Sequence, residues 1–152
     1  MKPSDFADDH GSRPAGTPAQ ERPGVLGDDF LFVSRQLVMF SDLNAHGRLF
    51  GGQLVSWLDA GVAQIAMRLM RTSNIVTKKL GEIIFENLGK LGDSVEIWCR
   101  VAREGKTSLT LEARVLVRDF SDATKPARPI CHSTIVYVAL DAAGRPWPWK
   151  GE

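Results

Sequence analysis

Asp59 is the residue of this 152-residue chain that is best placed for acid and base chemistry. Behind Gly51 and Gly52, apolar residues recur at helical spacing, which predicts a helix of roughly five turns from about Gly51 to Met70. Asp is a poor residue for a helix interior, and the neighbours of Asp59 are small instead of long and charged. A carboxylate in this setting suits a general base or a nucleophile. The predicted buried stripe is Leu54, Leu58, Gly61, Ile65 and Leu69, and Asp59 lies about a quarter-turn away with Gly52, Val55, Ala63 and Ala66.

The start of this predicted helix offers a group of opposite polarity. Unpaired amides and the positive end of the helix dipole would face a partly negative oxygen placed there. The N–H of Gly52 is the candidate donor, although a glycine here also suits a tight turn or close helix packing. Asn44, in the polar loop before the helix, could orient a reacting group or only shape the loop as an Asx-turn residue. The stretch therefore predicts an acid together with an anion-binding donor.

The same stretch resembles the signature of the hotdog-fold acyl-CoA thioesterases, in which an Asn and a Gly in a loop precede an F-G-G helix start and an acid follows inside the helix. Three further segments fall in the family's order and spacing, namely NIVTKK at 74–79, GD at 92–93 and GKTSLTLE at 105–112. The similarity covers about residues 35–140. The residues that match the signature are Asn44, Gly47, Phe50, Gly51, Gly52 and Asp59.

This resemblance implies hydrolysis of acyl-CoA to a fatty acid and free CoA. Asp59 would act as general base or nucleophile, Gly52 would donate its amide to the thioester oxygen, and Asn44 would orient water or the carbonyl. The resemblance implies no metal and no redox cofactor, because CoA is part of the substrate. Hydroxyls, amides and basic side chains near the third segment would hold CoA, unless this is only a solvated turn. The expected CoA-binding residues are Val76, Thr77, Lys78, Arg103, Gly105, Lys106, Thr107 and Ser108.

Two other functions stay open on the sequence. A non-catalytic acyl-CoA-binding or sensing module would keep the turn and the helix start but would not need Asp59. A hydratase of the same fold acting on enoyl or 3-hydroxyacyl thioesters would use His46 with an acid, but this chain lacks the proline-rich context of that histidine. No metal site is predicted, because His10, His46 and His132 are scattered and neither cysteine has a ligand spacing.

The remaining pattern predicts an α+β fold with one long helix on an antiparallel sheet of about five strands, which the resemblance specifies as a hotdog fold. Alternation of apolar and polar residues predicts a hairpin joined by REGK at 103–106, with its first strand half-buried. A polar connector should follow at 119–129. The predicted strands are Phe30–Phe40, one long segment over Ile75–Phe85, Val95–Val101, Leu109–Val117 and Ile130–Leu140.

Composition narrows the class of partner and compartment. With 19 Lys and Arg against 18 Asp and Glu, there is no overall field to attract nucleic acid or an anionic membrane. Two cysteines in strand-like runs and no segment resembling a signal peptide predict a soluble cytoplasmic protein. We expect a disordered arm at 1–27, the hotdog domain at 28–142 and a tail with two exposed-looking tryptophans at 143–152. The resemblance implies a homodimer as the minimum unit, assembled further into a tetramer or hexamer.

Overall fold

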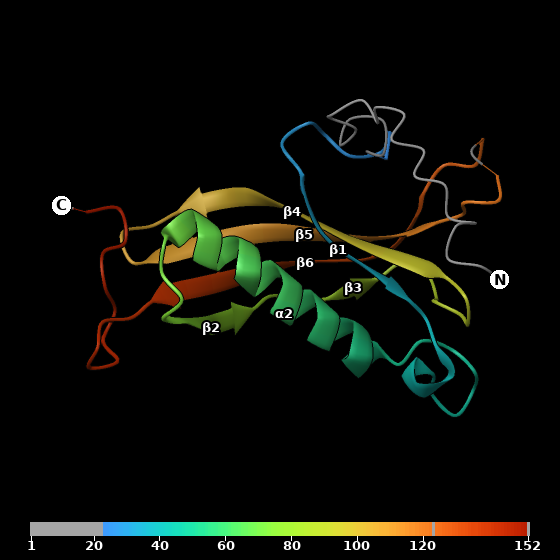
Figure 1. The fold of residues 1–152 in the computed structure, drawn as a ribbon, viewed down its shortest axis with the longest axis horizontal. Helices are drawn as coiled ribbons and strands as arrows, with labels where there is room; N and C mark the ends of the chain where they lie inside the picture. The colour runs from blue at the N-terminus through green and yellow to red at the C-terminus, as the bar shows by residue number, and fades with distance from the viewer. Residues whose placement is uncertain (1–22, 123, 152) are drawn as a thin grey trace, which may run out of the picture.

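The computed structural model describes residues 23–122 and 124–151 and places one long helix along one face of an antiparallel sheet (Figure 1). The strand order is β1-β4-β5-β6-β2, and β3 also pairs with β6. This arrangement confirms the predicted hotdog fold, with a sixth short strand added. The elements are β1 (Leu31–Leu37), a 3₁₀ turn η2 (Phe40–Asp42), α2 (Gly51–Met70), β2 (Ile75–Leu80), β3 (Ile84–Phe85), β4 (Ser94–Glu104), β5 (Ser108–Arg118) and β6 (Arg128–Ala139).

The helix begins and ends as the sequence predicts. It starts after Phe50, whose backbone is extended, and ends at Arg71, whose left-handed backbone (φ 55°) donates its N–H to the Met67 carbonyl. The predicted stripe is wrong at Gly61, which is only partly buried and faces β1. A Cβ on Gly61 would lie 2.8 Å from Val33 Cγ1, so glycine lets this strand approach the helix. The buried helix residues are Leu54, Leu58, Val62, Ile65, Ala66 and Met70, so Leu69 is also outside the buried set.

The predicted hairpin is confirmed, whereas two other strand predictions need correction. The predicted segment Ile75–Phe85 is divided into β2 and β3, because the Gly81 N–H bonds to the Thr134 carbonyl at 2.8 Å and the chain leaves the ladder there. A Cβ on Gly81 would lie 2.6 Å from Thr134 Oγ1. The first strand ends at Leu37, before η2, where the Met39 N–H bonds to the Asp42 carboxylate at 2.9 Å.

The two faces of the sheet are both covered where β4 begins, so the prediction of a half-buried strand is wrong there. Val95, Ile97 and Cys99 pack in the main core beneath α2. Their neighbours Glu96 and Trp98 point to the other face and are also buried. A small second cluster covers that face, formed by Phe30, Trp98 and Leu116 with Leu26 and Ala127 against them.

The ends of the chain differ in what the structure describes. Most of the predicted disordered arm at 1–27 lies outside the described residues. In its described part, Leu26 closes a turn by donating its N–H to the Pro23 carbonyl at 3.0 Å. At the other end, Trp149 is partly buried and donates its indole N–H to the Ser108 carbonyl at 3.2 Å, while Trp147 stays 42% exposed. The tail therefore docks on the β4–β5 hairpin of its own chain.

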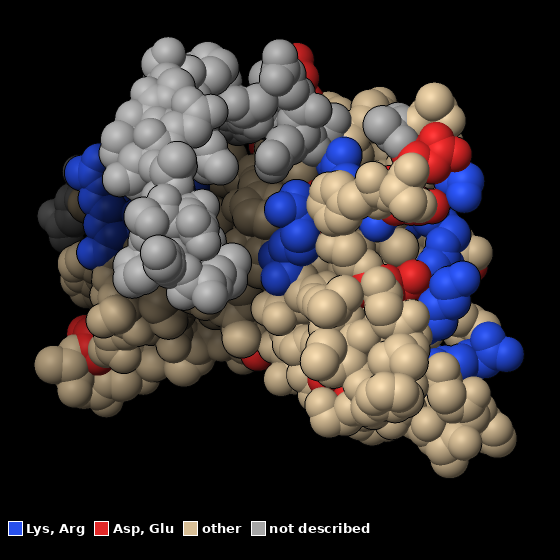
Figure 2. All heavy atoms as spheres, turned by 45° about the vertical axis from the view of Figure 1, so that its right-hand side comes forward, with Lys and Arg blue, Asp and Glu red and all other residues tan. Residues whose placement is uncertain are grey.

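Charge on the molecule is mixed. Figure 2 shows Lys and Arg side chains in several separate groups with acidic atoms among them, in keeping with the nearly balanced composition.

Polar and charged side chains interrupt α2, and the described part of the chain contains no helix with the length and apolar composition of a bilayer span.

Candidate active site

Asp59 lies two turns into α2 and is partly buried, with its two carboxylate oxygens in different surroundings. Oδ1 accepts a hydrogen bond from the Thr77 hydroxyl at 2.9 Å and lies 3.1 Å from the Tyr137 hydroxyl. Tyr137 Oη is also 3.1 Å from the backbone carbonyl of Asp59. Oδ2 has no hydrogen-bond partner among the described residues. The carboxylate is therefore held by one oxygen and open at the other.

Strand register brings the two hydroxyls to the same oxygen. Thr77 on β2 and Tyr137 on β6 are directly opposite each other in the antiparallel ladder, so their side chains leave the same face of the sheet. Helix α2 covers that face of the sheet, and Asp59 is the helix residue whose carboxylate meets both hydroxyls. Sequence analysis expected Thr77 to contact CoA, and the structure places its hydroxyl on Asp59.

Tyr137 is the site residue that sequence analysis missed. It is the only tyrosine of the chain and lies in the apolar second half of β6, from Ile135 to Ala139. A buried phenol hydroxyl needs a polar partner, and this requirement was the available signal. Burial, and then the negative charge of Asp59, raise the pKa of Tyr137, so its hydroxyl remains protonated and able to donate.

The start of α2 leaves two amides without acceptors in the described part of the chain, those of Gly51 and Gly52. The Phe50 ring folds over Gly52, where a Cβ would lie 2.6 Å from Phe50 Cε1. A side chain at Gly52 would have to displace this ring, which is 57% exposed, and the Gly52 amide has no described acceptor. Asp59 follows Gly52 by seven positions, which places it about 10 Å further along the helix axis.

Asn44 organises the loop before the helix. Its side-chain oxygen accepts the backbone N–H groups of His46 at 2.9 Å and Arg48 at 3.2 Å. This is the turn-forming arrangement, and it leaves the Asn44 NH₂ group with no acceptor in the described structure. The His46 ring is exposed, and no described acid forms a hydrogen bond or ion pair with it.

The expected CoA-binding residues fall in two places on either side of β6. The hairpin turn is closed by the Gly105 N–H bonding to the Ser108 carbonyl at 2.9 Å, and a Cβ on Gly105 would lie 2.3 Å from Ser108 Oγ. Val138 of β6 pairs with Ser108 on one side and with Val76 on the other, so the two places are about 10 Å apart. The basic side chains at these places, Lys78, Arg103 and Lys106, are exposed and form no ion pair within the described residues.

The remaining features that could carry chemistry are groups of metal ligands, the two cysteines and a cavity. Among the described residues, no three of His, Cys, Asp and Glu are grouped as metal ligands would be. Burial raises the pKa of Cys99 to about 12 and that of Cys131 to about 11, so both thiols stay protonated near neutral pH. A cavity of about 1020 Å³ at the end of the sheet near 118–129 is lined by none of the predicted site residues.

Comparison with known proteins agrees with this geometry. A family model described as "Thioesterase superfamily" matches residues 46–119. The acyl-CoA thioester hydrolase YciA of Salmonella typhimurium is 32% identical over 117 residues, which cover 76% of this chain and 87% of the relative.

Two solved structures are similar over most of the chain. The hexameric thioesterase y2039 from Yersinia pestis superposes with a TM-score of 0.71 at 30% identity, covering 81% of this chain and 97% of that one. The hexameric, broad-specificity acyl-coenzyme A thioesterase HI0827, in a form with one aspartate changed to alanine, gives a TM-score of 0.72 at 25% identity. That match covers 78% of this chain and 85% of the other.

Proposed function

Because this chain belongs to the thioesterase superfamily, and within it to the hotdog acyl-CoA thioester hydrolases, we propose that it hydrolyses acyl-CoA to a fatty acid and free CoA. The observation that carries the proposal is the carboxylate of Asp59, which is held through Oδ1 by two hydroxyls and leaves Oδ2 open. A carboxylate oxygen with no cationic partner, beside an otherwise apolar helix face, is a suitable base or nucleophile.

Each step of hydrolysis has a candidate group. Oδ2 of Asp59 takes a proton from water that attacks the thioester carbon, or attacks that carbon itself to form a short-lived anhydride. The amide of Gly52 donates to the carbonyl oxygen as negative charge develops there, and the NH₂ group of Asn44 orients water or the carbonyl. On the water route the C–S bond then breaks, and the CoA sulfur leaves with the proton taken from water. On the anhydride route the C–S bond breaks as the anhydride forms, and water then hydrolyses the anhydride, which protonates the sulfur and restores the Asp59 carboxylate. Water, a base and an oxyanion donor suffice, so the proposed reaction uses no metal and no redox cofactor.

We propose that the site is shared between two subunits. Within one chain, Gly52 and Asp59 are about 10 Å apart along the helix, which is far for two groups that must both meet one carbonyl. Large apolar side chains near the helix start are exposed and would be covered by a second copy. The similar structures from Yersinia pestis and of HI0827 are hexameric, which supports a dimer assembled further. The exposed residues are Met39, Phe40, Phe50, Phe85 and Leu88.

The proposed substrate extends from the carboxylate to the hairpin turn. The hydrogen-bonded turn at 105–108, with Lys106 and Arg103 exposed beside it, would hold CoA phosphates, and residues 76–78 of β2 would line the path to Asp59. A cytoplasmic setting, where acyl-CoA is used and thiols stay reduced, fits the two free buried cysteines.

Thiol release from a panel of acyl-CoAs of increasing acyl length tests the activity and reports chain-length preference. We expect thiol release by the full chain and its loss in Asp59→Asn. Asp28→Asn changes an exposed aspartate in the segment before β1. This variant is the matched control and should keep the activity. Tight binding of acyl-CoA without thiol release would support the binding-module alternative. Conversion of an enoyl thioester without free thiol would support the hydratase alternative.

A further inference from the structure

Tyr137 combines a packing role with a polar contact that packing does not require. Its side chain is fully buried and belongs to the main core, where a phenylalanine would fill the same space. Its hydroxyl nevertheless lies 3.1 Å from two oxygens of one residue, the backbone carbonyl and Oδ1 of Asp59. A buried hydroxyl costs free energy unless it is hydrogen-bonded. The presence of the Tyr137 hydroxyl at this position therefore indicates a role at Asp59.

We infer that the Tyr137 hydroxyl is a positioning group that fixes the orientation of the Asp59 carboxylate and directs reaction to its Oδ2 oxygen. This inference rests on the proposed function for its kinetic test. Tyr137 is fully buried, so it does not meet the substrate and acts only through Asp59.

The geometry shows how one oxygen is selected. Because the hydroxyl contacts both the backbone carbonyl and Oδ1 of the same residue, it restrains the side chain relative to the helix. The Thr77 hydroxyl reaches the same oxygen at 2.9 Å from the opposite strand. Oδ1 accepts the Thr77 proton and shares the one Tyr137 proton with the backbone carbonyl of Asp59, whereas Oδ2 has no described donor and keeps its lone pairs for a proton or for a carbon atom.

The contacts of the Asp59 carboxylate within the chain are to neutral groups. The described residues place no Lys, Arg or His within ion-pair distance of Asp59, so the donors from β2 and β6 have no cation to compete with. From β4, Cys99 is the other titratable group that interacts with Tyr137, and its raised pKa of about 12 keeps it neutral over the working range.

Tyr137→Phe is the direct test, because it removes only the hydroxyl. We expect kcat to fall by roughly tenfold to a hundredfold, with KM nearly unchanged, because the lost bond was made to a charged group. In an Asp59→Asn background, adding Tyr137→Phe should change the residual activity little. A folded Tyr137→Phe enzyme with wild-type kcat would overturn the inference.

A second measurement needs neither the Tyr137→Phe variant nor activity. Because the chain has one tyrosine, growth with 3-fluorotyrosine labels Tyr137 alone. The ¹⁹F resonance should shift in Asp59→Asn, because that substitution removes the carboxylate beside the Tyr137 hydroxyl.

The two failures are distinguishable. A ¹⁹F resonance that ignores Asp59 would refute the contact even in an active enzyme. Absence of thiol release from every acyl-CoA would refute the proposed function while leaving the Tyr137 to Asp59 contact measurable.

Discussion

The carboxylates on the two faces of the sheet are held in opposite ways. On the face beneath α2, Asp59 is bound through one oxygen by the neutral hydroxyls of Thr77 and Tyr137. On the other face, Glu96 is fully buried and both of its oxygens are occupied. Oε1 meets Arg118 Nε at 2.5 Å and Arg35 at 3.4 Å, and Oε2 accepts the Trp98 indole N–H at 3.1 Å.

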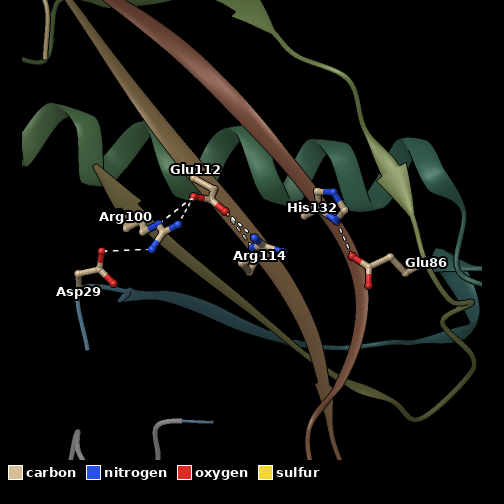
Figure 3. A network of polar contacts seen from close by, with 6 residues as sticks. All are labelled: Asp29, Glu86, Arg100, Glu112, Arg114 and His132. Atoms are coloured by element: carbon tan, nitrogen blue, oxygen red, sulfur yellow. Dashed lines mark hydrogen bonds and ion pairs between the residues drawn. The ribbon is translucent and has the colours of Figure 1, made fainter. Parts of the chain in front are cut away.

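A second group on that outer face repeats the arrangement of Glu96. Figure 3 shows Glu112 between Arg100 and Arg114, with α2 behind the strands. Its oxygens lie 2.8 Å from Arg100 and 2.6 Å from Arg114, and Arg100 also reaches Asp29 at 3.4 Å. Burial raises the pKa of Glu112, but the hydrogen bonds and charges of the two arginines outweigh it and hold the pKa below its usual value.

The difference separates structural acids from a reactive one. Arginines neutralise Glu96 and Glu112 and occupy both oxygens of each, so no lone pair with useful basicity is left for a substrate. Hydroxyls hold Asp59 without neutralising it and leave one oxygen open. The partner's chemistry, more than burial, therefore identifies the acid that is available for catalysis.

Replacing Asp59 should have the largest effect of the changes proposed here. It should lower the activity and leave the stability nearly unchanged. We expect Asp59→Ala to lower kcat by on the order of 10²-fold or more with little change in KM, because the group acts mainly in the transition state. The urea midpoint should move little, since the lost partners are neutral hydroxyls. Thiol release and urea unfolding on the same preparation measure both. A folded Asp59→Ala enzyme with near-normal kcat would remove Asp59 from the mechanism.

Changing Glu96 should show the converse. Glu96→Gln should lower the free energy of unfolding by about 2 to 3 kcal/mol, because Arg118 and Arg35 lose their buried anion. The folded fraction should keep its kcat. Urea unfolding followed by tryptophan fluorescence measures the loss, with Glu82→Gln, an exposed acid, as the control. Equal stability of the two variants would show that the outer-face ion pairs contribute nothing net.

Mixing subunits tests whether the open oxygen of Asp59 faces another chain. Asn44→Ala and Asp59→Ala preparations should each be nearly inactive. After random exchange, an intact site needs Asn44 from one kind of subunit and Asp59 from the other, so activity should return to about a quarter of wild type. No recovery after verified exchange would mean that both groups act within one chain, or that Asn44 only shapes its loop.

The smallest effect is expected at the hairpin turn, far from the carboxylate. Lys106→Ala should raise KM for acyl-CoA by roughly threefold to tenfold with kcat nearly unchanged, because an exposed cation contributes modest binding energy. Thioesters of pantetheine, which lack the nucleotide, should show no difference. Lys90→Ala, another exposed lysine, is the control. An unchanged KM with acyl-CoA would mean that the turn is only solvated and does not bind CoA.

The helix and the hairpin were predictable because their patterns are local. Spacing of apolar residues predicted a helix from about Gly51 to Met70, as observed for α2, and alternation predicted the β4–β5 pair. The break between β2 and β3 was not predictable, because it depends on contact between Gly81 and Thr134, which are distant in sequence. Burial of Glu96 was missed for the same reason, since it requires Phe30 and its neighbours to cover the outer face.

The site was predictable only in part. Asp59 was recognised from its small neighbours, and the structure adds that one of its oxygens is open. The contact with Tyr137 depends on strand register, because it requires β2 and β6 to pair with Thr77 opposite Tyr137. No local pattern contains that information.

The docked tail makes the C-terminus an unsuitable place for attachments. Trp149 bonds to Ser108, Lys150 pairs with Glu104, and the hairpin turn lies between these two anchors. An affinity tag or fluorescent protein fused after Glu152 would pull on the anchors of the turn proposed to hold the nucleotide. The same closeness makes Trp149 a built-in optical reporter, whose emission should change when that turn is occupied and should need no added dye.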